Sequence, residues 1–264
     1  MRTTNPLLTR LAADAERERA MSAQAQAVPY PTTADPSSAA PPQVRAMTVD
    51  DVVVRTIGLL ALVVLSAGAV WTLVPVENAL AVAFPAAMVG LVLGLVISFM
   101  RLANPLLIGL YAVVEGAFVG GVSHAFNELF DGIVLQAVAA TLGVFLLMAF
   151  LYKSGTIRAT PKFVRFMVGA LFGAAAVIVI NLVITLITGE ATPLRDGGPL
   201  AILVSLVFIV LAALSFILSF HEVEEGVKHG LPERYAWTCA FGIVVSLIWL
   251  YIEVLRLLSY FASE

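Results

Sequence analysis

The stretch GPLAILVSLVFIVLAALSFILS, residues 198–219, carries no charged side chain. A helix rises about 1.5 Å per residue, so a run of this length crosses the roughly 30 Å hydrocarbon core of a bilayer. Six further apolar runs of similar length occur in the chain. The predicted membrane spans are residues 52–74, 79–98, 104–126, 131–152, 164–188, 198–219 and 236–259.

Proline, glycine, asparagine and aspartate separate these runs, and the alternating ten-residue pattern of a membrane barrel is absent from the sequence. Thr48 can cap the first helix, with Asp51 at the capping-box position. The sequence therefore predicts an all-α, polytopic membrane protein with seven transmembrane helices.

The composition supports this fold class and excludes several functions. Of the 264 residues, 60% are hydrophobic and 12% are charged, against about 45–50% and 25% in soluble domains. The net charge of -3 gives no basic surface for nucleic acid. One cysteine and three histidines exclude a disulfide framework and disfavour a zinc cage. Catalytic motifs are absent from the sequence, so we expect no enzyme and no cofactor other than transiently bound calcium.

Two regions differ in character. Residues 1–46 hold five arginines and four acidic residues, and their second half is rich in proline. No apolar run precedes Val52, so we expect an uncleaved cytoplasmic tail rather than a secretory signal. Asn5 to Gln24 are predicted to form a short surface helix, followed by a disordered linker. Residues 47–264 form the predicted membrane domain.

The loops predict the orientation in a plasma or inner membrane. Lysine and arginine concentrate in the tail, after the second span at Arg101, between spans four and five, and between spans six and seven. Positively charged loops stay in the cytoplasm. We therefore expect the N-terminus inside and, after seven spans, the C-terminus outside.

Glycines recur at four-residue spacing within three spans, at Gly90 and Gly94, Gly116 and Gly120, and Gly169 and Gly173. Small residues at this spacing let helix backbones approach closely in lipid. We expect these pairs to pack helices within one bundle; a dimer face is the alternative.

Two acidic residues lie at hydrocarbon depth, where an ionisable group is costly. Glu115 is near the middle of span three, and is either a neutral hydrogen-bonded group or part of an ion or proton pathway. Glu253, in span seven, either pairs with Arg256 three residues later or faces Glu115 across a polar interior. A shared site of this kind would respond to pH.

A third cluster follows span six in the segment HEVEE, residues 221–225. On a continuing helix, His221 meets Glu224 and Glu225 at offsets of three and four. An imidazole beside carboxylates could sense pH near neutrality; a solvated helix end is the alternative. Arg101 could pair with this cluster or act as an ordinary anchor on the cytoplasmic side.

The chain resembles the Bax inhibitor-1 family, in particular its bacterial, YccA-like branch. The matching segments, in this order along the chain, are Asn5-Pro6, residues 48–56, Tyr111 to Gly116, residues 220–227, residues 232–235 and residues 249–258. The resemblance implies six helices around a central seventh, a pH-sensitive calcium leak and, in some bacterial members, a regulatory contact with a membrane-bound AAA protease.

In this family an aspartate on each of the last two helices is gated by protonation, and an arginine at the end of the second helix can latch onto the first of them. The resemblance places that arginine at Arg101. It places the aspartates at Ser219 or His221 and near Ser246, none of which is an acid. Glu224 or Glu225 would have to replace the sixth-helix acid.

Our leading hypothesis is a slow, pH-sensitive calcium or proton leak. In it, Glu115 and Glu253 form the ion pathway, while Arg101, His221, Glu224 and Glu225 form the cytoplasmic gate. The alternative is a non-conducting regulator that binds an AAA protease or another partner through its long tail. A solute transporter would instead show broken helices in two corresponding halves, a symmetry that the sequence lacks.

Overall fold

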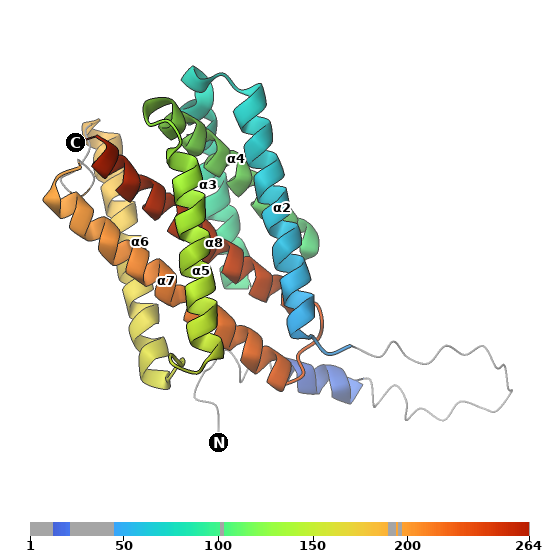
Figure 1. Cartoon of the computed structure of the whole chain (residues 1–264). Helices are drawn as coiled ribbons and strands as arrows, with labels where there is room; N and C mark the ends of the chain where they lie inside the picture. The colour runs from blue at the N-terminus through green and yellow to red at the C-terminus, as the bar shows by residue number, and fades with distance from the viewer. Residues whose placement is uncertain (1–12, 22–44, 101–102, 190–193, 195–196, 264) are drawn as a thin grey trace, which may run out of the picture.

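A computed structural model describes residues 13–21, 45–100, 103–189, 194 and 197–263. A short helix over residues 13–21 precedes seven long, apolar helices (Figure 1). The seven are α2 (Val49–Leu73), α3 (Val76–Met100), α4 (Pro105–Leu129), α5 (Ile133–Lys153), α6 (Pro161–Thr188), α7 (Pro199–Lys228) and α8 (Tyr235–Ala262). The prediction of an all-α protein with seven candidate membrane spans is confirmed.

The first long helix begins as the sequence predicts. The side chain of Thr48 accepts a hydrogen bond from the backbone N–H of Asp51 at 3.2 Å, and Asp51 Oδ2 accepts one from the N–H of Thr48 at 2.9 Å. This reciprocal pair satisfies two of the N–H groups that a helix start leaves free. Helix α7 extends nine residues beyond the apolar run that ends at residue 219, because the segment around His221 continues the helix to Lys228.

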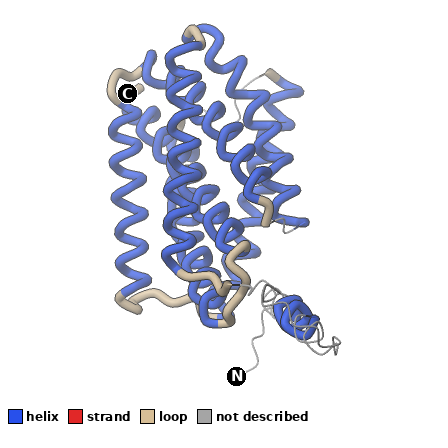
Figure 2. Tube along the Cα trace, turned by 90° about the vertical axis from the view of Figure 1, so that its right-hand side faces the viewer, coloured by secondary structure: helices blue, strands red, loops and turns tan. Residues whose placement is uncertain are grey.

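The last helix crosses the middle of the bundle, with other helices on its sides (Figure 1), and the bundle is entirely helical when seen from the side (Figure 2). In the most apolar window of α8, 72% of the residues are buried, against 17–44% in the other spans. It packs against α2, α4, α5 and α7. The central position of the seventh helix is thus confirmed, whereas α3 packs mainly on α4 and α6 on α7, outside that inner ring.

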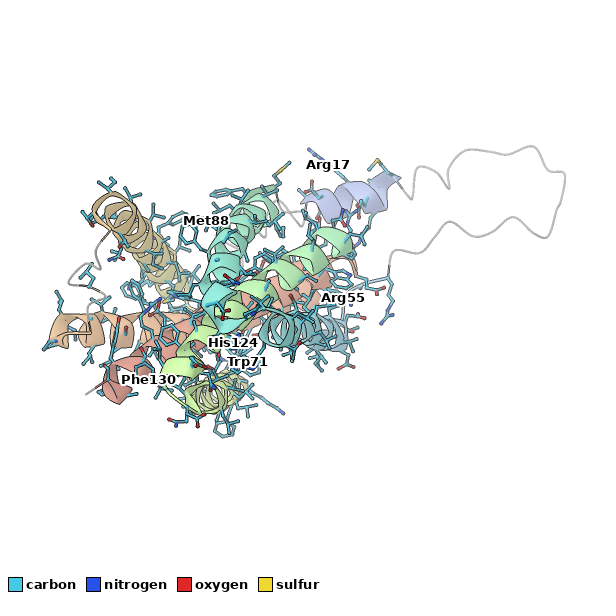
Figure 3. All side chains as sticks on the ribbon, turned by 90° about the horizontal axis from the view of Figure 1, so that it is seen from above. Arg17, Arg55, Trp71, Met88, His124 and Phe130 are labelled. Atoms are coloured by element: carbon cyan, nitrogen blue, oxygen red, sulfur yellow. The ribbon has the colours of Figure 1, made fainter. Side chains whose placement is uncertain are left out.

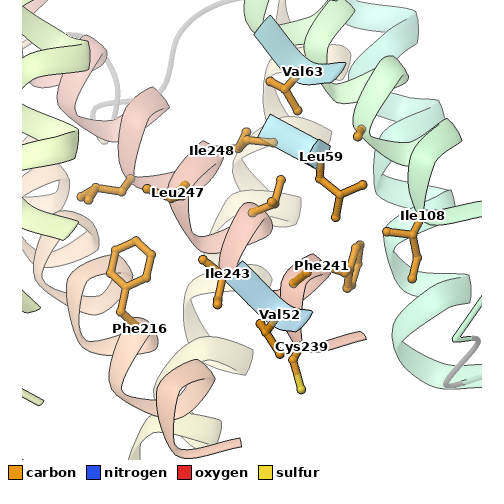
Figure 4. Close-up of a cluster of buried hydrophobic side chains, with 14 of the residues drawn as sticks. Val52, Leu59, Val63, Ile108, Phe216, Cys239, Phe241, Ile243, Leu247 and Ile248 are labelled. Carbon is orange, nitrogen blue, oxygen red and sulfur yellow. The ribbon is translucent and has the colours of Figure 1, made fainter. Parts of the chain in front are cut away.

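The least apolar spans of this bundle are the most buried. The two spans of lowest mean hydropathy, α4 and α8, have the largest buried shares. Lipid is as apolar as leucine, so the least apolar helices gain most by facing protein. The core around α8 is nevertheless apolar: Leu59 of α2, Phe216 of α7, and Phe241 and Ile243 of α8 belong to one buried cluster (Figure 4).

Glycines set the distance between α4 and α2. A Cβ added at Gly116 would lie 2.5 Å from the carbonyl oxygen of Val63, and one at Gly120 would lie 2.5 Å from that of Ala67. These positions therefore permit backbone contact that no other residue allows. Within-bundle packing is confirmed for this pair.

The other two glycine pairs differ from each other. Gly90 and Gly94 of α3 lie against the side chains of Glu115 and Tyr111 on α4, as expected for packing within the bundle. For Gly169 and Gly173, the prediction of packing is wrong in the described part of the chain, where nothing lies within 4 Å of an added Cβ. The cause is the outer position of α6, which packs mainly on α7.

The described part of the tail confirms a helix over residues 13–21, inside the predicted Asn5–Gln24 segment. Residues 5–12 and 22–24 of that segment, and the predicted linker as far as residue 44, lie outside the described residues. The last two residues of the predicted linker are ordered, because Arg45 and Ala46 pair with the loop between α7 and α8. The sides of the membrane on which the termini lie stay predictions from the loop charges.

We predict that Gly120→Ala destabilises the bundle by about 1–3 kcal/mol, because the new methyl group would overlap the α2 backbone. Thermal unfolding of the purified protein in detergent measures the loss. Gly143→Ala on α5 is the matched control, since an added Cβ there meets nothing within 4 Å. An equal effect of the two substitutions would contradict the role given to Gly120.

Candidate functional site

Glu115 projects from the middle of α4 toward α3. An added Cβ at Gly90 would lie 2.7 Å from its Oε1, so the carboxyl group occupies the space that this glycine leaves open. Tyr111, one turn earlier on α4, is the neighbouring polar side chain that interacts with the carboxyl group. Among the described residues no cation pairs with it. Glu115 is thus a half-buried carboxyl group beside a phenol, at the contact of two helices.

Glu253 is paired locally. Nη1 of Arg256 lies 2.7 Å and 2.8 Å from its two carboxylate oxygens, and the glutamate side chain is 3% exposed. Both residues line a cavity of about 10 Å³ together with Asn181 of α6 and Ser205 of α7. This volume is close to the minimum that holds one water molecule. Of the two predicted alternatives for Glu253, the structure shows the ion pair with Arg256 on the same helix.

The two acids do not share a site, so the predicted joint ion pathway of Glu115 and Glu253 is wrong in its geometry. The hydroxyl groups of Ser123 on α4 and Tyr251 on α8 lie 2.6 Å apart, which sets the register of these helices. Glu115 precedes Ser123 by eight residues, or roughly 12 Å along the axis. Glu253 follows Tyr251 by two residues, so its side chain is rotated by about 200° around the axis of α8 relative to that of Tyr251. Glu253 therefore faces α6 and α7, away from α4.

Serine hydroxyls occupy the contact between the last two helices. Ser215 on α7 donates to Ser246 on α8 at 2.9 Å, and Ser246 donates to the carbonyl oxygen of Gly242 at 3.0 Å. The residue hydrogen-bonded to Ser246 is therefore Ser215, whereas the resemblance placed the sixth-helix aspartate at Ser219 or His221. Hydroxyl groups stay neutral over the physiological range, so this contact cannot act as a protonation-gated acid pair.

Among the described residues, neither Glu224 nor Glu225 forms an ion pair or hydrogen bond with His221, and their predicted joint role as a gate stays a prediction. Glu224 accepts a short hydrogen bond from the hydroxyl of Tyr152 on α5. Glu225 lies 3.3 Å from Lys228 Nζ and 3.7 Å from Nδ1 of His229, so the histidine beside a carboxylate is a different one. Helical spacing alone could not show that α5 competes for Glu224. Arg101 lies outside the described residues, and its latch stays a prediction.

The end of the bundle where α2 begins holds an ion-pair cluster that the sequence analysis did not identify. We call it the clamp: Arg45, Asp51, Arg55 and Glu233. Arg55 Nη2 lies 2.6 Å from Glu233 and its Nη1 3.4 Å from Asp51, while Arg45 reaches the same two acids at 4.0 Å and 3.3 Å. Each arginine therefore bridges both carboxylates. The clamp joins the start of α2 to the loop between α7 and α8.

Other contacts extend the clamp. The guanidinium of Arg55 lies 5.4 Å from the ring centroid of Trp237 on α8, in cation–π geometry. Backbone hydrogen bonds of 2.8 Å and 2.9 Å join Met47 to Leu231 and Glu233 to Arg45. Seen from above, Arg55 and Phe130 lie on different sides of the molecule (Figure 3). The sequence signal was the concentration of charge in two of the segments matching the family, 48–56 and 232–235.

The tail helix docks on the same loop. Glu18 accepts a short hydrogen bond from Arg234, and Nη2 of Arg19 donates to the carbonyl oxygen of Gly230 at 3.3 Å. Ala15 of this helix is buried, 7% exposed. The tail thus contacts the membrane domain at the loop that the clamp fixes.

A lateral groove lies between α2 and α5, with α7 and α8 as its floor. Its volume is about 970 Å³, and a second hollow of about 360 Å³ meets it at Leu60. The first is lined by Val49, Val52, Val53, Thr56, Ile57, Leu60, Phe145, Ala149, Tyr152, Lys153, Arg158, Phe220, Val223, Glu224, Val227, Lys228 and Ile243. In the described residues no group of three metal-ligating side chains gathers.

These features define a polytopic, all-helical membrane protein with a central last helix and a charged clamp at one end. The sequence pattern of the family described as Bax inhibitor 1 like matches residues 5–263, nearly the whole chain. The protein belongs to the Bax inhibitor-1 family. No curated protein matches the sequence.

We predict that Arg256→Met costs about 3–5 kcal/mol of stability, because it leaves the carboxylate of Glu253 buried without its partner. Replacing both residues, Glu253→Gln with Arg256→Met, removes the charge as well and should recover most of the loss. Thermal unfolding of the single and double variants in detergent measures the coupling. Additive losses would mean that the two side chains do not depend on each other.

Proposed function

We propose that this protein is a non-conducting regulator that binds a partner in the same membrane through its tail and the loop between α7 and α8. The observation that carries the proposal is the attachment of the tail helix to that loop through Glu18, Arg19 and Arg234. The clamp fixes the loop to α2 and α8. A partner bound there would contact a surface whose position the membrane helices determine.

The partner class comes from the family resemblance, which implies an AAA protease anchored in the membrane for some bacterial members. The charges of the docking surface fit a protein partner that extends the contact of the tail helix with the loop. The arrangement of acids gives less support to conduction. Glu253 is neutralised by Arg256, and serines stand at the contact of the last two helices.

A second candidate is the calcium or proton leak, and Glu115 favours it. A carboxyl group at hydrocarbon depth without a cationic partner in the described residues is a feature of ion pathways. Hard cations also prefer carboxylate oxygen. Since Ser215 and Ser246 hold no titratable pair, such a leak would lack the family's gate at this contact.

The partner hypothesis predicts that Arg234→Glu lowers retention of the membrane-bound AAA protease on the purified full chain several-fold. Like charges at Glu18 and position 234 would release the tail helix. The double reversal Glu18→Arg with Arg234→Glu should restore retention. Quantitative mass spectrometry of the co-purified protease measures it. Equal retention by all three proteins would contradict the proposed docking surface.

Flux measurement separates the two candidates. Liposomes loaded with a calcium dye and containing the parent protein should leak no faster than empty liposomes between pH 6 and 8. Glu115→Gln should leave this rate unchanged, as should the exposed control Glu77→Gln. A parent leak that Glu115→Gln alone abolishes would establish the second candidate instead.

A further inference from the structure

We propose that the lateral groove between α2 and α5 binds one anionic phospholipid, drawn from the leaflet on the side where α2 begins. The groove combines an apolar body with a cationic mouth, and these two properties match the two parts of such a lipid. Its volume of about 970 Å³ is at the upper end of the range of ligand sites, roughly 300–1,000 Å³.

The body of the groove suits acyl chains. Its walls are formed by valine, leucine, isoleucine and phenylalanine side chains of α2, α5, α7 and α8. The one hydroxyl in the wall of α2, Thr56, is already bonded to the carbonyl oxygen of Val52 at 2.8 Å. A polar ligand would find no partner along this surface, whereas hydrocarbon loses nothing there.

The length of the groove matches one leaflet. On α2 it runs from Val49 to Leu60, which is eleven residues or roughly 17 Å of helix. Half of a typical hydrocarbon core is about 15 Å. An acyl chain entering at the end near Val49 therefore reaches the narrowing at Leu60, where the second hollow begins.

The mouth of the groove carries excess positive charge. Lys153 and Arg158 are exposed there and form no ion pair within the described part of the chain. The carboxylate of Glu224, which accepts a hydrogen bond from Tyr152, offsets only one of the three positive charges that line the groove. Lys228, 70% exposed, lies 3.3 Å from Glu225. Cations between transmembrane helices at the membrane surface attract anionic headgroups. A zwitterionic lipid would leave this charge uncompensated.

A transmembrane helix of another protein is a less suitable occupant. It could fill the apolar body, but its presence would not explain two unpaired cations at the level of the headgroups. An anionic phospholipid accounts for both observations at once.

Native mass spectrometry of the full-length protein tests the assignment, using phosphatidylglycerol and phosphatidylethanolamine with identical acyl chains. We expect phosphatidylglycerol to bind roughly tenfold more tightly or better, since each of the two free cations contributes about a fivefold preference. Lys153→Gln with Arg158→Gln should remove this preference. Lys162→Gln with Arg165→Gln is the matched control: it removes the same charge from exposed positions that do not line the groove.

Ala149→Trp, which fills the groove from α5, should weaken binding of both lipids, and thermal unfolding checks that each variant is folded. Equal affinity for the two lipids, or equal loss in the two charge-neutralised proteins, would overturn the proposal. So would a second protein chain that remains bound while neither lipid is retained. The charge variants alter exposed side chains, so they decide the question even if Ala149→Trp does not fold.

Discussion

The structure depends on one constraint: polar groups within the hydrocarbon must be satisfied inside the protein, because lipid offers them no partner. The last helix carries Ser246, Glu253 and Ser259, all buried. Placing α8 in the centre surrounds these groups with α2, α4, α5 and α7, which supply partners such as Ser215. The most apolar surfaces then face outward, and α3 and α6 lie at the edges of the bundle.

The same constraint keeps the acids of the membrane interior apart. Glu253 meets its requirement with Arg256 on its own helix, and Glu115 lies beside Tyr111, also on its own helix. Neither needs a partner on a distant helix. Because the register of α4 and α8 is set by the contact between Ser123 and Tyr251, the two carboxyl groups lie at different depths and face different neighbours. The two acids therefore do not form one continuous acidic path.

Charge is instead organised at the end where α2 begins. The clamp alternates two arginines with two carboxylates, so that the start of α2 and the loop before α8 neutralise each other. The tail helix and the mouth of the lateral groove lie at this same end. A partner protein and a lipid headgroup would therefore act on neighbouring parts of one surface. Coupling between them would pass through α2, which contributes to both the clamp and the groove.

Much of the fold could be predicted from the sequence because it depends on local properties. Run length and apolar composition determine the spans, and Thr48 with Asp51 determines where α2 starts, since both requirements act within a few residues. The pairing of Glu253 with Arg256 belongs to the same class, because three residues along a helix bring side chains together. Tertiary structure alone decided which way Glu115 points, that Tyr152 hydrogen-bonds to Glu224, and that Arg55 meets Glu233. The hydrogen bond from Tyr152 to Glu224 joins residues 72 positions apart in the sequence, and the one from Arg55 to Glu233 joins residues 178 positions apart. No local pattern encodes them, because they depend on how whole helices pack.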